Sequence, residues 1–424
     1  MNKIFLIVLV MTLGLEGAVK PKQEKNNVLP IEINDETYIL GALDAQMRQK
    51  HDLASSYFEA LYGKTGRKEY LYQSLRMLEQ SNNTEKLTRL TQSALAANPE
   101  DQTLQRFAVI ALLKSGKYSQ AAQESSTLSE KTKAAGDYAL NAEALIKLGN
   151  FQGAYTALKK GYELTHDQEM ADRISLIMYA HLEQKKEAIA FLKEHIVLYG
   201  NSKIIGKRLG SLYADSGELN DAALMYEQTY DLTLDPLIAQ EAIKIYAYQQ
   251  DIVKLNVLLE KSGVNDALLL DLYVRNKQFD KASELAKKLY KQDQNPLYLA
   301  QSSVFAYEAS PNKNDPILLT AVVDGLKEAN SEMESPLYAN YLGYLMIDHD
   351  IDIDGGIVYV KKALLAQPES PFYLDSLAWG YYKKGECAEA LRLMKQVESM
   401  IGTDEQEVKD HLKAIETCKT KEKK

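Results

Sequence analysis

Residues 371–391 read PFYLDSLAWGYYKKGECAEAL, and residues 336–363, PLYANYLGYLMIDHDIDIDGGIVYVKKA, follow the same plan one repeat earlier. In both segments a proline opens an apolar run, a polar turn interrupts it, and a second apolar run follows. Small residues stand where two helices must approach closely: Gly343 and Gly356 in one segment, Ala378 and Ala390 in the other. The pattern predicts two helix–turn–helix pairs over 336–402.

These segments resemble tetratricopeptide repeats, which are built from helix pairs of 34 residues. The pair over 336–402 is most similar to the closing pair of exported bacterial proteins of this family. The resemblance implies an all-α solenoid that binds peptides or partner helices in a concave groove, which is an expectation from family analogy.

Weaker copies of the repeat precede this pair. A small or apolar residue recurs at the eighth position of each unit with a spacing of 33 or 34, at Ala42, Leu75, Val109, Ala142, Leu176 and Gly210. Each pair can bury its apolar stripe only against its neighbours, so the unit must repeat in register. From residue 237 onward the register slips, and the turn 310–316 is lengthened.

The expected architecture is therefore a right-handed superhelix of about eleven helix pairs with a C-terminal capping helix. Its expected parts are an N-terminal array over 38–263, irregular repeats over 264–335, the closing pair over 336–402, and a capping helix with a basic tail over 403–424. A boundary between 263 and 335 is an alternative to one continuous solenoid. In the capping helix, Leu412 and Ile415 are expected to face inward.

The N-terminal residues 1–18 have the features of an export signal. Lys3 provides a positive charge, and an apolar run of 12 residues (4–15) follows, which is too short to span a bilayer comfortably. Residues 19–37 are polar, contain two prolines and are expected to be a linker. We therefore expect a periplasmic protein with no membrane span after signal removal; an uncleaved anchor is the alternative.

Charge and motif content argue against several function classes. The net charge of −9 disfavours nucleic-acid binding, which needs a clustered basic face. No nucleotide-binding or nucleophile motif stands in a strand–turn–helix context, and the repeats occupy nearly all of 38–402, so we expect no enzyme and no cofactor. The run Asp350, Asp352, Asp354 and Gly355 opens like a calcium loop, but Lys361 stands where the twelfth, bidentate Glu is required. An acidic turn that caps a helix explains the run without a metal.

The two cysteines, Cys387 and Cys418, are expected to form a disulfide. An exported chain permits such a bond. Cys387 begins the last second helix and Cys418 ends the capping helix, which places both at the same end of the stack. Two free thiols are the alternative.

The partner-binding surface is expected on the first helices of the two closing repeats. Positions 2, 5, 9 and 12 form one stripe beside the packing stripe. The stripe residues are Leu337, Asn340, Tyr344, Ile347, Phe372, Asp375, Trp379 and Tyr382. Aromatic groups around a few polar groups resemble an interaction hot spot. The alternative is that the capping helix folds over Phe372 and Trp379 and makes them structural.

We therefore expect a scaffold or adaptor in the bacterial cell envelope that binds one or more envelope proteins or peptides. A subunit of an assembly platform and a regulator of an envelope enzyme acting in trans are the alternatives.

Overall fold

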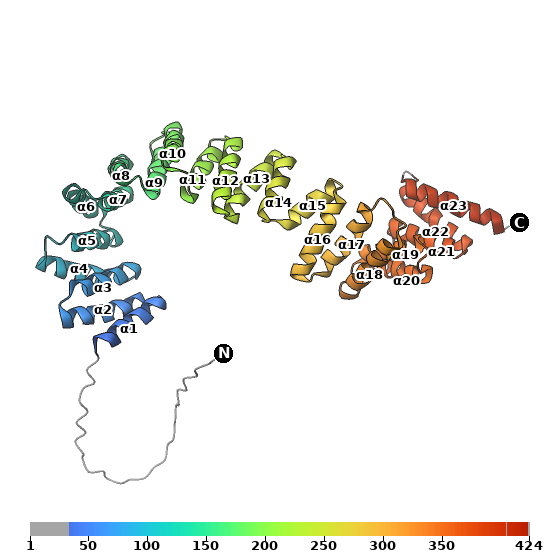
Figure 1. Cartoon of the computed structure of the whole chain (residues 1–424), viewed down its shortest axis with the longest axis horizontal. Helices are drawn as coiled ribbons and strands as arrows, with labels where there is room; N and C mark the ends of the chain where they lie inside the picture. Colours follow the sequence, from blue (N-terminus) through green and yellow to red (C-terminus); the bar gives the residue numbers. More distant parts are fainter. Residues whose placement is uncertain (1–33, 404, 423–424) are drawn as a thin grey trace, which may run out of the picture. The chain divides into compact units, whose positions relative to one another are not determined.

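The computed structural model describes residues 34–403 and 405–422; the expected export signal and most of the expected linker lie outside them. The described residues form 23 helices and no strand (Figure 1). The helices alternate as first and second members of eleven antiparallel pairs, and α23 follows the last pair. The chain is an all-α solenoid of repeats, as the sequence predicts.

The chain divides into two compact units, one ending at Phe191 and one beginning at Leu192. The helices of unit 1 are α1 (Asp35–Met47), α2 (His51–Thr65), α3 (Lys68–Gln80), α4 (Thr84–Ala97), α5 (Gln102–Lys114), α6 (Tyr118–Thr132), α7 (Ala135–Lys147), α8 (Phe151–Thr165) and α9 (Gln168–His181). Helix α10 (Lys185–Tyr199) contains the division, which lies inside the array expected over 38–263.

Unit 2 contains the remaining helices. They are α11 (Lys203–Asp215), α12 (Leu219–Thr233), α13 (Pro236–Gln249), α14 (Ile252–Ser262), α15 (Asp266–Arg275), α16 (Phe279–Asp293), α17 (Pro296–Ala309), α18 (Pro316–Glu332), α19 (Pro336–Asp348), α20 (Ile353–Ala366), α21 (Pro371–Lys383), α22 (Cys387–Ile401) and α23 (Gln406–Glu422).

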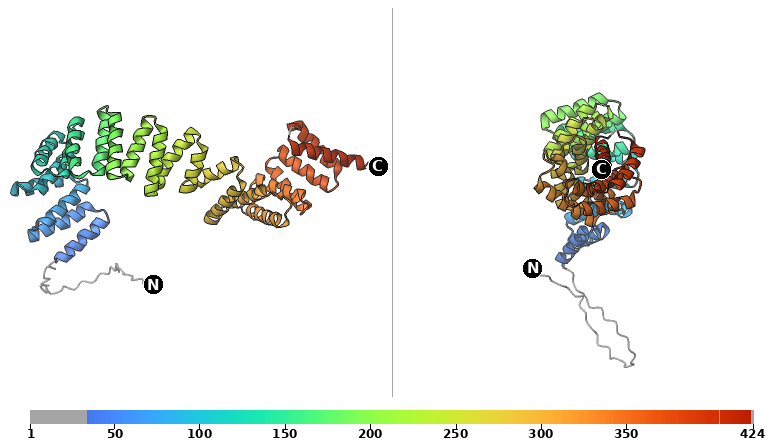
Figure 2. Two further views of the ribbon diagram at one scale, coloured as in Figure 1. Left: turned by 45° about the horizontal axis from the view of Figure 1, so that its top comes forward. Right: turned by 90° about the vertical axis from the view of Figure 1, so that its right-hand side faces the viewer.

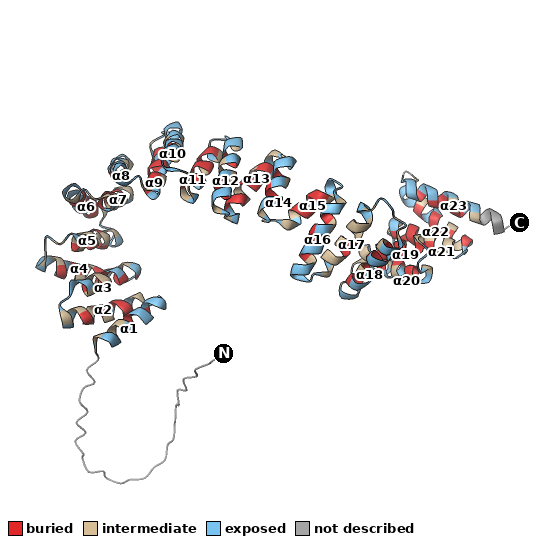
Figure 3. Ribbon diagram, viewed as in Figure 1, coloured by how far each residue is buried: buried red, intermediate tan, exposed pale blue. Residues whose placement is uncertain are grey.

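Two buried positions recur in every pair of the described helices. The eighth residue of each first helix is buried: Ala42, Leu75, Val109, Ala142, Ser175, Gly210, Ile243, Tyr273, Ser303, Gly343 and Ala378. The fourth residue of each second helix is also buried: Ala54, Leu87, Ala121, Ala154, Ala188, Ala222, Leu255, Ala282, Leu319, Gly356 and Ala390. Figure 3 shows that buried residues lie on the faces where neighbouring helices meet. Counted from the first residue of each helix, the buried positions are therefore the same in every repeat.

The fifth pair corrects one prediction. Leu176, expected at the buried eighth position, is 39% exposed, whereas Ser175 is fully buried. The side chain of Asp167 accepts a hydrogen bond from the backbone N–H of Met170 and starts α9 at Gln168, one residue earlier than a strict spacing implies. The capping residue therefore sets the register.

Helices α19 and α20 approach each other closely at Gly343 and Gly356. A Cβ added to Gly343 would lie 2.6 Å from the carbonyl oxygen of Gly356, and the reverse distance is also 2.6 Å. No side chain fits between these backbones. The small residues quoted from the sequence are therefore required by the packing of α19 against α20.

Helix α23 packs against α21 and α22 at the C-terminal end of unit 2 (Figure 2, left). Val408, Leu412 and Ile415 point into the core that Leu393 and Val397 share. The inward orientation predicted for Leu412 and Ile415 is confirmed. None of the 23 helices has the length and hydropathy needed to cross a membrane.

Candidate functional site

A pocket of about 410 Å³ opens at the C-terminal end of unit 2. It lies between three first helices, α17, α19 and α21, and the beginning of α23. Its lining residues are Tyr307, Glu308, Asn340, Tyr341, Tyr344, Leu345, Asp348, Phe372, Asp375, Ser376, Glu405, Glu407 and Val408. We call it the acidic pocket.

Carboxylates dominate the polar lining of the acidic pocket. They are Glu308, Asp348, Asp375, Glu405 and Glu407, and no lysine or arginine is among the lining residues. Two of these carboxylates are oriented by tyrosines: Tyr341 donates to Glu308 Oε1 at 2.7 Å, and Tyr344 donates to Glu407.

The titration of the tyrosines reflects this environment. Burial, and then the hydrogen bond to a carboxylate, raises the pKa of Tyr341 and of Tyr344 far above the ordinary value. The pKa of Tyr307 is raised to about 12 by burial and then by the negative charges of Asp348, Glu308 and Glu407. The hydroxyls therefore stay protonated, and the pocket has a negative potential.

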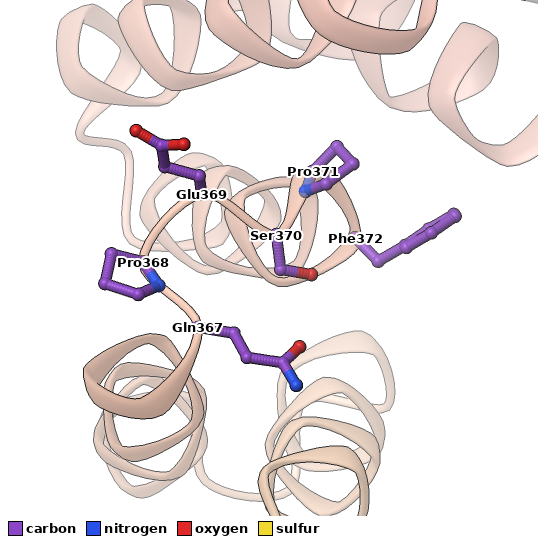
Figure 4. A pocket seen from close by; sticks show the side chains of 6 residues that line it. All are labelled: Gln367, Pro368, Glu369, Ser370, Pro371 and Phe372. Carbon is purple, nitrogen blue, oxygen red and sulfur yellow. The ribbon is translucent and has the colours of Figure 1, made fainter.

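An amide and an exposed ring complete the pocket. The Oδ1 atom of Asn340 is buried and has no hydrogen-bond partner, so it is an unused acceptor. Phe372, at the start of α21, is 61% exposed. Its ring projects away from the ribbon in Figure 4, where it also lines a second cavity of about 620 Å³ along the α20–α21 connection. Phe372 therefore offers an apolar contact at the edge of both hollows.

The structure corrects the predicted position of Ile347. It is fully buried in the core, and a Cβ on Gly380 would lie 3.0 Å from its Cδ1 atom. The stripe predicted along α19 begins exposed at Leu337 and ends in the core, because the next pair covers the C-terminal half of the helix. Ile347 is unavailable to a partner.

Asp375 and Trp379 are covered by α23. Asp375 is buried and lies 2.9 Å from Nδ1 of His411. The indole of Trp379 stacks on the His411 ring, with 4.2 Å between centroids, and its Nε1 donates to Asp348 at 3.0 Å. The alternative considered for Trp379, a structural contact with the capping helix, is the arrangement found. The same alternative is wrong for Phe372, which stays exposed.

The remaining residues of the predicted partner-binding stripe fall into two groups, inside and outside the pocket lining. Asn340, Tyr344 and Phe372 line the acidic pocket together with Asp375, whereas Leu337 is 59% exposed and lies outside the lining. Tyr382 stacks on Trp379, with 4.9 Å between centroids, and is also outside the lining.

Sequence reasoning missed the part of the pocket contributed by α17 and α23. Tyr307 and Glu308 precede the lengthened turn, and Glu405 and Glu407 flank the start of α23. Tyr307 is the twelfth residue of α17 and therefore occupies a position of the predicted stripe, but the stripe was assigned only on α19 and α21. No repeat position connects Glu405 and Glu407 with Tyr344, since α23 belongs to no repeat, and the consecutive acids before the last amphipathic run were the signal available there.

Cys387 and Cys418 are bonded to each other in the structure, with 5.8 Å between their Cα atoms. The bond ties the start of α22 to the last turns of α23. It therefore holds the helix that closes one side of the acidic pocket.

The acidic turn before α20 is engaged by the chain's own groups. The side chain of Asp352 accepts a hydrogen bond from the backbone N–H of Gly355 at 2.9 Å and caps α20. Asp350 pairs with Lys383 and Asp354 with Lys384. Nowhere in residues 34–403 and 405–422 do three or more His, Cys, Asp or Glu side chains gather as a metal site would require.

Helix lengths and recurring buried positions show that the described residues form an all-α solenoid of repeated helix pairs. No protein-family model matches the chain, and no curated protein matches it.

Solved structures with some similarity include three helical proteins. The APC/C hetero-tetramer Cut9–Hcn1 aligns over 90% of this chain and 96% of that chain, at 12% identity and a TM-score of 0.35. Yeast Tom70 aligns over 92% and 96%, at 12% identity and a TM-score of 0.33. TTC0263, a thermophilic TPR protein of Thermus thermophilus, aligns over 50% of this chain and 98% of that chain, at 19% identity and a TM-score of 0.31.

Proposed function

We propose that this chain is a protein-binding scaffold of the bacterial cell envelope and that its acidic pocket receives a segment of a partner protein. One observation carries the proposal: aromatic rings and hydrogen-bond acceptors from α17, α19, α21 and α23 converge on one hollow. Interaction hot spots combine aromatic anchors with a few oriented polar groups in this way. Catalysis is not part of the proposal.

Site-specific photo-crosslinking in cells tests the proposal. A benzoylphenylalanine placed at Phe372 should give adducts with one or a few recurrent proteins. The matched control is Ile317 on α18, which is 81% exposed and lies outside the acidic pocket. Identical adducts from both positions, or none from Phe372, would refute the proposal. One recurrent partner corresponds to an adaptor or an enzyme regulator, and many co-assembled subunits correspond to an assembly platform.

The envelope location rests on residues 1–18, whose charge and apolar run match an export signal. Native protein isolated from cells should begin near Ala18 or Val19 and should fractionate with the periplasm. Intact Met1 on a cytoplasmic protein would contradict the location and would leave the binding role of the pocket unaffected.

A further inference from the structure

We infer that the acidic pocket is a receptor for the guanidinium group of an arginine on the partner protein, an inference that rests on the proposed function. Three features of the pocket favour a guanidinium group: unpaired carboxylates, free hydrogen-bond acceptors and aromatic walls.

Among the described residues outside the pocket, two tyrosine–carboxylate pairs are neutralised by a lysine, whereas no salt bridge reaches the carboxylate in the pairs Tyr246–Glu227 and Tyr290–Glu328. Tyr273 donates to Glu260 at 2.7 Å, and Lys281 lies 2.9 Å from the same carboxylate and 5.3 Å from the tyrosine ring. In unit 1, Tyr72 donates to Asp101, which Lys68 also contacts at 3.1 Å. A cation from the chain itself thus accompanies both of these pairs.

The pair of Tyr344 and Glu407 lacks this cation. No described lysine, arginine or histidine is paired with Glu407, and none is paired with Glu405 beside it. The basic groups nearby contact other lining residues and not Glu405 or Glu407. Lys313 lies 3.5 Å from Glu308, Lys383 bonds Asp350 and the backbone carbonyl of Asp348, and His411 bonds Asp375. Lys409, two residues after Glu407 on α23, is exposed and lies outside the lining.

The free acceptors of the lining include the oxygens of Glu405, the remaining oxygen of Glu407 and the unpartnered Oδ1 of Asn340. A guest that satisfies them must offer several donors in different directions. Guanidinium has five N–H donors in a planar fork and pairs with carboxylates through two parallel bonds, whereas ammonium is a compact point charge.

The walls of the pocket suit a flat cation. Tyr307, Tyr341, Tyr344 and Phe372 present rings to the hollow. One of these rings already has a cation from the chain itself, because Lys313 Nζ lies 4.4 Å from the Tyr307 centroid. Rings of this kind attract cations and stack on the guanidinium plane. The negative charge of the lining, its need for several hydrogen-bond donors and its aromatic rings therefore all favour an arginine side chain.

The only tryptophan of the sequence reports on the pocket. Trp379 Nε1 donates to Asp348, which lines the pocket, so its indole gives a single N–H resonance sensitive to a guest. The full chain, labelled with ¹⁵N, is titrated with acetyl-arginine methylamide and with acetyl-citrulline methylamide. Citrulline has nearly the same shape but no charge. We expect a saturable shift with the arginine compound and binding at least about tenfold weaker with the citrulline compound, which is about 1.4 kcal/mol.

Two variants connect the shift with the pocket. Glu407→Gln removes the unpaired charge and should weaken binding of acetyl-arginine methylamide by about tenfold. Glu334→Gln, an exposed acid outside the lining, is the matched control and should leave binding unchanged. Retained helical circular dichroism in both variants excludes unfolding as the cause.

Three results would overturn the inference: equal binding of the arginine and citrulline compounds, binding of acetyl-lysine methylamide as tight as that of the arginine compound, or no effect of Glu407→Gln. Failure here together with partner adducts at Phe372 removes only the arginine assignment. Loss of the Phe372 adducts removes the proposed function itself.

Discussion

Two buried aspartates join one first helix to the next, one in each compact unit. In unit 1, Asp137 on α7 accepts two hydrogen bonds from Arg106 on α5, at 2.6 and 2.8 Å. In unit 2, Asp375 on α21 is bonded to His411 on α23. Since α23 contacts both α21 and α22, it takes the place of a first helix after the last pair.

The two pairs differ in the cation and in what surrounds it. Arg106 is permanently charged and binds with both arms of its fork, and Thr132 adds a third hydrogen bond to Asp137. His411 is charged only when protonated, and its ring is stacked on Trp379. Inside the array, an ion pair links neighbouring repeats. At the end of the chain, stacking and a disulfide hold a helix that has no second helix of its own among the described residues.

The largest expected loss of stability comes from breaking the Arg106–Asp137 pair. Arg106→Ala leaves a buried carboxylate without its cation and should lower the unfolding free energy of unit 1 by about 3 to 5 kcal/mol. Urea unfolding at neutral pH measures the loss. Lys131→Ala, which removes an exposed pair with Glu100, is the control and should cost less than about 1 kcal/mol. Similar losses of unfolding free energy in both variants would show that the buried pair contributes no more to stability than the exposed pair.

The same pair predicts a pH dependence. Burial by itself would raise the pKa of Asp137, but the bonds from Arg106 and Thr132 outweigh it and hold this pKa below the usual value. The stabilisation is therefore present above the unfolded pKa of about 3.9 and is lost as the pH falls through the folded pKa. The difference in stability between wild type and Arg106→Ala should shrink as the medium is acidified.

Reduction of the disulfide should have the next largest effect. The bond joins residues 31 apart in sequence, and chain-entropy arithmetic gives about 3 to 4 kcal/mol. Because repeats lose stability locally, hydrogen exchange should rise in α23 while α19 to α21 stay protected. Even loss of protection through unit 2 would contradict this localisation. Two free thiols in denatured, unreduced protein would exclude the bond.

Removing the histidine should have a smaller effect. His411→Ala deletes a hydrogen bond to a buried carboxylate and the stacking partner of Trp379, and it should cost about 2 to 3 kcal/mol. Trp379 fluorescence should shift to longer wavelength as α23 opens. The neighbouring Asp410→Ala, an exposed site, should change stability by less than about 0.5 kcal/mol. An unchanged emission spectrum in His411→Ala would show that α23 stays in place without the pair.

The smallest expected effect concerns the tyrosine hydroxyls. Tyr344→Phe removes the bond to Glu407, an exposed residue that water can solvate, and should cost at most about 0.5 kcal/mol. Tyr246 is only 2% exposed, and its hydroxyl donates a hydrogen bond to Glu227. Tyr246→Phe removes this bond and should lower the unfolding free energy by about 1 kcal/mol. Thermal unfolding of the two variants measures the difference. A larger loss from Tyr344→Phe would indicate that this hydroxyl stabilises the fold rather than the pocket.

The sequence by itself determined the repeat architecture and its closest contacts. The period of about one helix pair, the small residues Gly343 and Gly356, and the inward faces of Leu412 and Ile415 all follow from apolar spacing. Spacing is sufficient for these features because each pair packs only on its neighbours, so local pattern and tertiary contact coincide.

The register of the fifth pair was set by a local cap that the repeat spacing did not include: Ser175 rather than Leu176 is buried because Asp167 caps α9 one residue early. Only the tertiary structure decided the lining of the pocket. Tyr307 and Glu407 meet around Tyr344 although they are far apart in sequence, Ile347 leaves the predicted surface because the next pair covers it, and Asp375 lines the pocket but is bonded to His411 of α23. A repeat period states which side of a helix faces its neighbours. It cannot state what covers the other side, since that depends on an irregular repeat and on a helix outside the period.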